Sequence, residues 1–247
     1  MKLKRIVNLL RYGWGEEGKK QKQLDKQKRR QEKFQSERWE KGGDVVRRRY
    51  ASYDDYLQHQ RAKLDTIVHR LQESEKEDYE EFRRRFATCD ALQGKRSVLC
   101  LGARLGTEVK ALHSLGYFAV GIDLNPGENN SYVLPGDFHS LVFPDGSVDA
   151  VYCNAFDHAY DPERNITEVR RVLDRGGVFI LDQLEGFREG FIPGEYESFH
   201  WRDRNVLNDK ICEWGGFEMV SERDLGRHRR DRWYQVVFRK RPTPANQ

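Results

Sequence analysis

Continuous apolar runs alternate with amphipathic runs in the second half of the chain, and this alternation predicts its elements. Residues 98–101 are apolar throughout, as is typical of a parallel strand that is covered on both faces. A glycine-containing turn, a predicted helix and a second strand ending at Asp123 follow. The pattern predicts a strand, helix and strand unit, in which the first turn of the helix offers unpaired N–H groups to a ligand.

The turn holds Gly102 and Gly106, and Asp123 follows about 20 residues later, as in nucleoside-binding units. Asp123 stands at the carboxyl end of the second strand, where it can accept hydrogen bonds from both ribose hydroxyls. A dinucleotide fingerprint G-x-G-x-x-G would also need glycine where Arg104 and Thr107 stand. This mismatch counts against a nicotinamide-dependent dehydrogenase.

Amphipathic runs before this unit predict helices. One run begins at Tyr50 and continues through residues 64–71, and a second covers residues 77–92. The residues expected to face the ligand cleft are Tyr53, Tyr56, His59, Gln60 and Lys63, of which the last four share one helical face. A solvated surface helix is the alternative interpretation.

The segment after the last buried strand is rich in aromatic residues. Residues 184–201 hold five aromatic side chains, three glycines and a proline, and a long loop of this kind in a compact α/β domain is more often functional than idle. We expect it to contact a substrate, with capping of the core as the alternative. A helix near 203–214 and strands at 217–221 and 234–238 are predicted to complete the chain.

Positive charge is concentrated at the amino-terminal end. Residues 1–50 carry a net charge of +10, whereas residues 51–247 carry −6. Residues 16–41 are polar nearly all round, which predicts an exposed helix or partial disorder. Residues 1–14 form a short basic amphipathic pattern, which fits an anionic membrane surface, nucleic acid, or packing on a partner or on the chain itself.

Three motifs in order resemble the class I S-adenosylmethionine-dependent methyltransferases, of the methyltransferase type 11 kind. Residues 98–106, VLCLGARLG, resemble the family pattern VLDLGxGxG. Residues 135–158 resemble the segment that leads into the fourth strand of the family, and residues 171–183 resemble its helix, Gly-Gly turn and fifth strand. The resemblance covers residues 95–183 closely and the remainder to Arg241 more loosely.

The resemblance implies an α/β fold with a Rossmann-like, seven-stranded, mostly parallel sheet that ends in an antiparallel hairpin. We expect a basic helical or partly disordered arm at 1–50, a helical cap of the cofactor cleft at 51–94, the cofactor-binding domain at 95–241 and a tail at 242–247. The implied cofactor is S-adenosyl-L-methionine, and no metal is expected.

The resemblance also assigns roles to individual residues. Asp123 would bind the ribose, Asp137 would accept a hydrogen bond from the adenine amino group, and Phe138 would flank the adenine ring. Asn154 would line the methionine end of the cleft. The full set expected to bind the cofactor is Gly102, Ala103, Arg104, Gly106, Glu108, Asp123, Leu124, Asp137, Phe138 and Asn154.

The chain departs from the family pattern at two positions. The family's acid, which receives the cofactor's ammonium group, is Cys100 here, and the middle glycine is Arg104. A guanidinium group suits the cofactor's carboxylate, and Glu108 in the first turn of the next helix could serve the ammonium group. Without such compensation the chain would be a non-catalytic relative.

Methyl transfer to oxygen benefits from a base near the reacting atoms. His158, which follows the fourth strand, is the first candidate, with Asp157 orienting it or acting in its place and His200 as the second histidine. A histidine with a purely structural role is the alternative for His158. The sequence lacks an N-P-P-Y pattern after this strand, which counts against nucleobase-amine or glutamine targets.

We therefore expect O-methylation of a small molecule, such as a sugar or a carboxylate-bearing metabolite. An RNA methyltransferase that uses the basic arm and a cofactor-binding scaffold protein are the alternatives. The four cysteines form no C-x-x-C pair, and no stretch approaches the roughly 18 apolar residues of a membrane span. Both observations favour a reduced, cytoplasmic protein, whose basic arm contacts RNA or an anionic membrane surface if it is a recruitment element.

Overall fold

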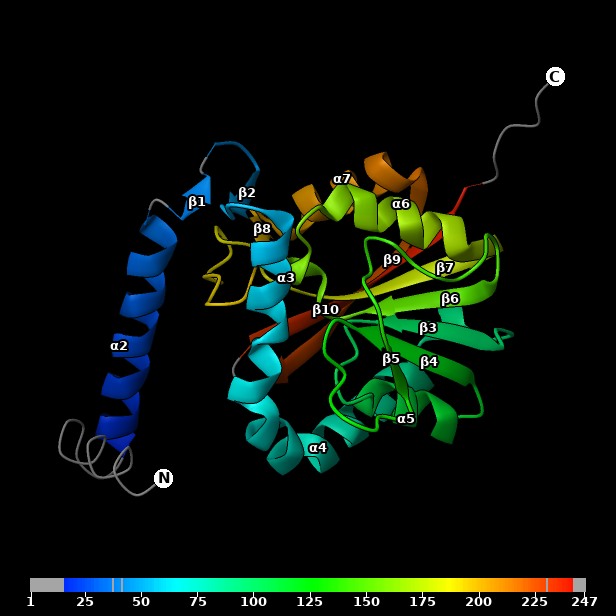
Figure 1. Ribbon diagram of the computed structural model, residues 1–247, viewed down its shortest axis with the longest axis horizontal. Coiled ribbons are helices and arrows are strands. Elements are labelled where there is room, and N and C mark those ends of the chain that lie inside the picture. Colours follow the sequence, from blue (N-terminus) through cyan, green and yellow to red (C-terminus); the bar gives the residue numbers. More distant parts are fainter. Residues whose placement is uncertain (1–15, 37, 41, 230, 242–247) are drawn as a thin grey trace.

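A computed structural model describes residues 16–36, 38–40, 42–229 and 231–241. The basic amphipathic pattern of residues 1–14 and the expected tail at 242–247 lie outside these ranges. Within them, α and β elements alternate around one central sheet, which is flanked by helices on both faces (Figure 1).

The central sheet has seven strands in the order β5-β4-β3-β6-β7-β10-β9, which confirms the predicted fold. The first five in this order are parallel, and β10 pairs antiparallel with both β7 and β9. The strands are β3 (Ser97–Leu101), β4 (Phe118–Asp123), β5 (Val133–Pro135), β6 (Val148–Cys153), β7 (Leu173–Leu184), β9 (Phe217–His228) and β10 (Asp231–Lys240). The last two strands are longer than predicted because their pairing continues beyond the apolar stretch.

Two apolar cores lie on the two faces of this sheet. Helices α4 (Lys63–Ala87) and α5 (Thr107–Ser114) cover one face, and α6 (Pro162–Val172) and α7 (Arg204–Gly215) cover the other (Figure 1). Side chains of Asp161 and Asp203 accept hydrogen bonds from the first turns of α6 and α7, which fixes where these helices begin. The parallel strands are therefore buried on both faces, as their continuous apolar sequence predicts.

The helices before the sheet form a lid beside its carboxyl edge. Helix α3 (Tyr53–Arg61) begins at Ser52, whose hydroxyl accepts from the Asp55 backbone, and α4 follows after one residue (Figure 1). The predicted division into one run from Tyr50 through 71 and a second helix at 77–92 is wrong, since the break falls at Ala62 and α4 then runs unbroken to Ala87. The residues between the two apolar runs are helix formers without glycine or proline, so nothing interrupts the helix. A 3₁₀ turn, Asp90–Leu92, leads into β3.

A second, three-stranded sheet joins the arm to the aromatic segment. Strands β1 (Trp39–Glu40), β2 (Val45–Arg48) and β8 (Phe199–Trp201) pair antiparallel in that order. The segment 184–201 is therefore not wholly a loop, since its first residue ends β7 and its last three form β8. The sequence pattern did not predict this sheet, because its strands are short and distant in sequence.

The arm contains helix α2 (Glu16–Gln35), which stands apart from the sheet and its helices in Figure 1. Contacts to the rest of the chain lie near its end, where the Phe34 ring packs at 5.3 Å from Trp39 and 6.0 Å from Phe187. Among the described helices, none is long and apolar enough to cross a membrane.

Candidate active site

A cleft enclosing about 480 Å³ of space, partly open to solvent, lies where the lid meets the carboxyl ends of β3, β4 and β6. In open α/β sheets, ligands bind at this carboxyl edge of the strands. Its lining residues are Tyr56, Gln60, Lys63, Leu64, Gly102, Arg104, Asp123, Leu124, Asn125, Phe138, Ala155 and His158. Five residues of the expected cofactor set thus come together with the first catalytic candidate.

The glycine turn after β3 has a backbone that few side chains tolerate. Gly102 has φ +69°, and a Cβ there would lie 2.8 Å from Cβ of Ala155 across the cleft. Gly106 has φ +76° and precedes α5, and a Cβ there would lie 2.7 Å from Cβ of Tyr132. Gly106 is therefore required for packing against the segment before β5, and Gly102 alone of the two lines the cleft.

Arg104 stands where the family pattern has a glycine, and its backbone is left-handed. Its φ of +45° lies in the left-handed region, which non-glycine residues rarely adopt. Its backbone N–H donates to Oδ2 of Asp123 at 3.1 Å, and its side chain lines the cleft. The turn thus places a guanidinium group in the cleft while its backbone holds the Asp123 carboxylate.

Asp123 ends β4 at the cleft, where the Asn125 backbone also donates to its Oδ1 at 2.8 Å. Burial raises the pKa of this carboxyl, although the two backbone donors and the Arg104 charge oppose the rise. The carboxylate is held rigidly by backbone groups of both neighbouring turns. This arrangement suits recognition of a pair of adjacent hydroxyls.

The hydroxyl of Tyr56 on α3 is a buried polar group in the cleft that a ligand could bind. Tyr56 is 0% exposed and lines the cleft, and its hydroxyl oxygen has no hydrogen-bond partner among the described residues. Burial and the nearby Asp137 carboxylate raise its pKa, so the hydroxyl keeps its proton and remains a donor. A buried hydroxyl without a partner costs free energy, which a ligand such as S-adenosylmethionine would recover by accepting from it.

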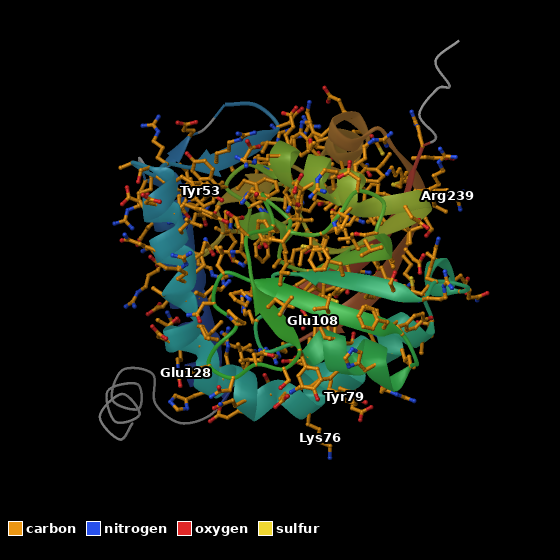
Figure 2. The ribbon with its side chains drawn as sticks, turned by 45° about the vertical axis from the view of Figure 1, so that its right-hand side comes forward. Tyr53, Lys76, Tyr79, Glu108, Glu128 and Arg239 are labelled. Carbon is orange, nitrogen blue, oxygen red and sulfur yellow. The ribbon has the colours of Figure 1, made fainter. Side chains whose placement is uncertain are left out.

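Asp137 lies beside the cleft without lining it. Its carboxylate accepts from the Tyr53 hydroxyl and from the His139 backbone at 2.9 Å, with His139 Nδ1 at 2.8 Å. Burial raises the pKa of this carboxyl, but these hydrogen bonds outweigh burial and the pKa is lowered overall. Tyr53 lies at the upper end of the lid in Figure 2, and the adjacent Phe138 lines the cleft.

The position of the family's acid is deeply buried. Cys100 is fully enclosed, and burial together with the nearby Glu108 carboxylate raises the pKa of its thiol, which stays neutral. Glu108 is 5% exposed, and burial raises the pKa of its carboxyl to about 8. Figure 2 shows Glu108 near the centre of the molecule. Neither residue lines the cleft. Glu108 lies in the first turn of α5, which follows the glycine turn directly.

His158 is engaged by the lid. Its Nδ1 lies 2.7 Å from the carbonyl oxygen of Tyr196, which can only accept, so Nδ1 carries the hydrogen. Its Nε2 lies 2.6 Å from Nζ of Lys63 and accepts from it. Burial and the positive charges of Lys63 and Arg104 lower the pKa of His158 well below its usual range. His158 is therefore a neutral acceptor whose lone pair is already in use.

Asp157, next to His158, faces a different cavity together with Asn154. Burial and the Glu197 carboxylate raise the pKa of Asp157 to about 7, against the opposing charge of Lys63. Asp157 therefore changes protonation near neutral pH, which is a property of general bases.

The remaining expected residues lie away from the cleft. Ala103 is buried under the turn and its backbone donates to Ile122. His200 is in β8, fully buried against the ring of Trp201 at 4.5 Å, and burial lowers its pKa to about 3. The residues that the sequence did not single out are Asn125 and Ala155 in the cleft and Gln183 and Trp233 beside Asp157. Trp233 lies in the antiparallel strand β10, far in sequence from Asp157, so no local motif predicts their proximity.

Comparison with known proteins agrees with this geometry. Residues 99–181 match the family described as methyltransferase domain. Sterol 24-C-methyltransferase of Gibberella zeae is 32% identical over 36% of this chain and 27% of its own length. The chain thus matches little more than a quarter of that enzyme.

Solved structures share the fold at low identity. The 1,6-didemethyltoxoflavin-N1-methyltransferase of Burkholderia thailandensis, bound to S-adenosylhomocysteine and 1,6-didemethyltoxoflavin, is 14% identical, with a TM-score of 0.63 over 82% of this chain and 98% of that one. A possible histamine N-methyltransferase of Thermotoga maritima is 18% identical, with a TM-score of 0.57 over 74% and 99%. Residues 99–181 thus match a methyltransferase domain, and the fold is the one that these methyltransferase structures share.

Proposed function

We propose that this protein transfers the methyl group of S-adenosylmethionine to an oxygen atom of a small molecule. The observation that carries the proposal is the unpartnered Tyr56 hydroxyl, which faces the same cleft as the backbone-anchored Asp123 carboxylate. One is a buried donor and the other a half-buried acceptor, at the edge of the sheet where this fold receives ligands. Together they match the acceptor and donor groups of a nucleoside.

The side chains around the glycine turn suit the amino acid end of the cofactor. Arg104 lines the cleft with a cation for the carboxylate of the cofactor. Glu108, which is buried behind the cleft lining, is the acid that we propose for the ammonium group in place of the one that Cys100 replaces. A bound ammonium group would draw the proton from Glu108, because an adjacent positive charge favours the ionised carboxylate.

The bound cofactor supplies an activated methyl group, and the protein's part is to position the acceptor and exclude water. In-line placement accounts for much of the rate of such a transfer. The contact between Lys63 and His158 closes the lid against the segment after β6, so these residues position the site. Asp157 is the preferred base, because the lone pair of His158 is used and His200 lies in the small sheet.

Hydrogen bonds across the cleft favour a small acceptor over a polymer. Gln60 of the lid donates to the Tyr196 carbonyl at 2.8 Å and to Ser198 at 3.0 Å, which ties α3 to the aromatic segment over the cleft. A polynucleotide strand would need an open groove to reach the reacting methyl group. The lid contacts therefore support a metabolite as substrate.

The test is incubation of a metabolite extract with isotopically methyl-labelled S-adenosylmethionine, read by mass spectrometry. We expect a small labelled product in which the methyl group is on oxygen, and much less of this product with the Asp123→Ala variant at the same cofactor concentration. Label found on RNA would favour the RNA methyltransferase, and cofactor binding without any labelled product would favour the scaffold protein. Label on nitrogen or carbon of a small molecule would contradict the O-methylation proposal.

A further inference from the structure

Two positive side chains face the cofactor cleft, one from the lid and one from the sheet edge. Lys63 in the first turn of α4 and Arg104 in the turn after β3 both line it. The Arg104 charge helps to lower the pKa of both Lys63 and His158, so the three groups share one space. Within the described part of the chain, no carboxylate forms an ion pair with Lys63 or Arg104. Both cations are therefore available to a ligand.

The acids near these cations are engaged elsewhere. Asp123 accepts from two backbone N–H groups and is assigned to the ribose. Glu197 accepts from the backbone of Gly194 at 2.6 Å. Asp157 lines a second, smaller cavity with room for about one water, and its pKa is raised to about 7 by burial and by Glu197. These three carboxyls raise the pKa of Lys63 from a distance, but none of them is its partner.

Lys63 lies on the side of the cleft that the aromatic segment forms. Its Nζ is 2.6 Å from Nε2 of His158 and 5.4 Å from the centre of the Tyr196 ring. That ring stacks on His59 at 5.0 Å, and the Tyr196 carbonyl accepts from His158. An ammonium group has three N–H donors, of which His158 accepts one. Two donors therefore remain for an anion beside this aromatic wall.

The cofactor alone cannot balance the charge of the cleft. S-adenosylmethionine has one carboxylate, which is assigned to Arg104, but it also has a positive ammonium group and a positive sulfonium. Among the lining residues, Asp123 is the one acid beside Lys63 and Arg104. Buried charge without a counter-charge costs free energy. A second substrate with a negative charge would offset this cost and would favour the protonated form of Lys63.

The side chains of the cleft also suit an acceptor that needs no base. The lone pair of Nε2 of His158 is used by Lys63. Asp157, the preferred base for a hydroxyl acceptor, lines the second cavity on the other side of the segment after β6. A carboxylic acid ionises at a pKa of about 4, so at neutral pH its oxygen already carries the attacking lone pair.

We propose that the methyl acceptor is a small carboxylic acid, that it is methylated on a carboxylate oxygen, and that Lys63 binds this carboxylate. One carboxylate oxygen accepts from Nζ of Lys63, and the other attacks the methyl group. The inference rests on the proposed methyl transfer and narrows its acceptor. It removes sugar hydroxyls from the choices that the sequence left open.

The chemical step balances without a proton transfer. A lone pair of the carboxylate oxygen forms the bond to the methyl carbon, while the bond from carbon to sulfur breaks with its electron pair remaining on sulfur. The products are a methyl ester and S-adenosylhomocysteine. Because the ester has lost the negative charge, it no longer pairs with Lys63, and this favours its release.

The first measurement treats the labelled small product from the metabolite extract with mild alkali. A methyl ester is hydrolysed to labelled methanol and the parent acid, whereas a methyl ether keeps its label. We expect the label to leave as methanol, and mass spectrometry of the remaining acid identifies the acceptor. Label that survives alkali overturns the carboxylate assignment alone. No labelled product from any extract overturns the proposed function itself.

The second measurement compares Lys63→Met with His158→Phe, since both remove the same hydrogen bond and only the first removes a cation. With the identified acid as substrate and S-adenosylmethionine at saturation, Lys63→Met should raise KM for the acid about tenfold or more, and Lys63→Arg should recover part of this loss. His158→Phe should raise KM far less. Lys95→Met is the matched control, because Nζ of Lys95 donates to Gly176 away from the cleft, and it should leave KM unchanged.

Calorimetry with S-adenosylhomocysteine shows whether these variants are folded and which carboxylate Lys63 binds. Lys63→Met and His158→Phe should weaken S-adenosylhomocysteine binding to the same extent. A much larger loss in Lys63→Met would mean that Lys63 binds the cofactor's carboxylate, which overturns the assignment. An unchanged KM in Lys63→Met, or equal increases in Lys63→Met and His158→Phe, would overturn it as well.

Discussion

Nζ of Lys63 lies 2.6 Å from Nε2 of His158, which links the first turn of α4 to the segment after β6 across the cofactor cleft. Because Nδ1 of His158 donates to the Tyr196 carbonyl, the histidine is neutral and receives the lysine's hydrogen. The contact joins the lid, the sheet edge and the aromatic segment at one point. We interpret it as the latch that holds the lid over the cofactor.

The latch predicts coupled effects on cofactor binding. Lys63→Met and His158→Phe should each weaken S-adenosylhomocysteine binding by roughly 1 kcal/mol, because each leaves the lid without its closing hydrogen bond. The double variant should bind about as weakly as the weaker single variant, since both remove one interaction. Lys95→Met is the control, because Nζ of Lys95 donates to Gly176 away from the cleft. Additive losses in calorimetry would show that the two side chains act independently.

Arg104 should contribute charge to the cleft at the cost of backbone strain. Arg104→Ala and Arg104→Gly both remove the guanidinium group, so both should weaken S-adenosylhomocysteine binding to the same extent, by about 1 kcal/mol or more. Only the alanine variant keeps a side chain at φ +45°, so it should unfold at lower urea concentration than the glycine variant. Cofactor affinity equal to the parent in both variants would remove Arg104 from the site.

Glu108 should make the free protein less stable as pH rises. Its pKa in the fold is about 8 because of burial, above the ordinary value of an unfolded glutamate. The folded state therefore resists ionisation, and stability falls between about pH 5 and pH 8 by ~1.4 kcal/mol for each pH unit that this residue controls. Glu108→Gln should flatten this dependence and raise the melting temperature at pH 8. An unchanged slope of stability against pH would show that the carboxyl ionises freely.

Two truncations separate the charge of the arm from its packing. Removal of residues 1–28 leaves Arg30 and Phe34, which contact Phe191 and Phe187 of the aromatic segment, and Trp39, which packs on Phe34. We expect this truncation to keep cofactor affinity and to abolish attraction to anionic vesicles or RNA, an attraction that added salt also weakens. Removal of residues 1–41 also deletes buried Trp39 and strand β1, and should lower the melting temperature by several degrees. Equal stability of both truncations would contradict a structural role for Trp39.

The sequence predicted the fold and the sheet edge that holds the cofactor cleft, because apolar runs and the glycine turn are local signals. Gly102, Arg104 and Asp123 meet there as their positions at strand ends imply. The latch and the second cavity could not be predicted. Lys63 and His158 are 95 residues apart, and Gln183, Trp201 and Trp233 meet only through strand pairing and the small sheet. Such contacts depend on tertiary packing, which no spacing in the sequence encodes.

Cofactor binding at Asp123 and Tyr56 is tested most directly by calorimetry with S-adenosylhomocysteine. Asp123→Ala should weaken binding by about 2 kcal/mol, because charge-assisted hydrogen bonds to the ribose are lost. Tyr56→Phe should weaken it by about 1 kcal/mol without loss of stability, because the removed hydroxyl has no partner among the described residues. Parent affinity in both folded variants, or equally tight binding of NAD by the parent protein, would contradict the account.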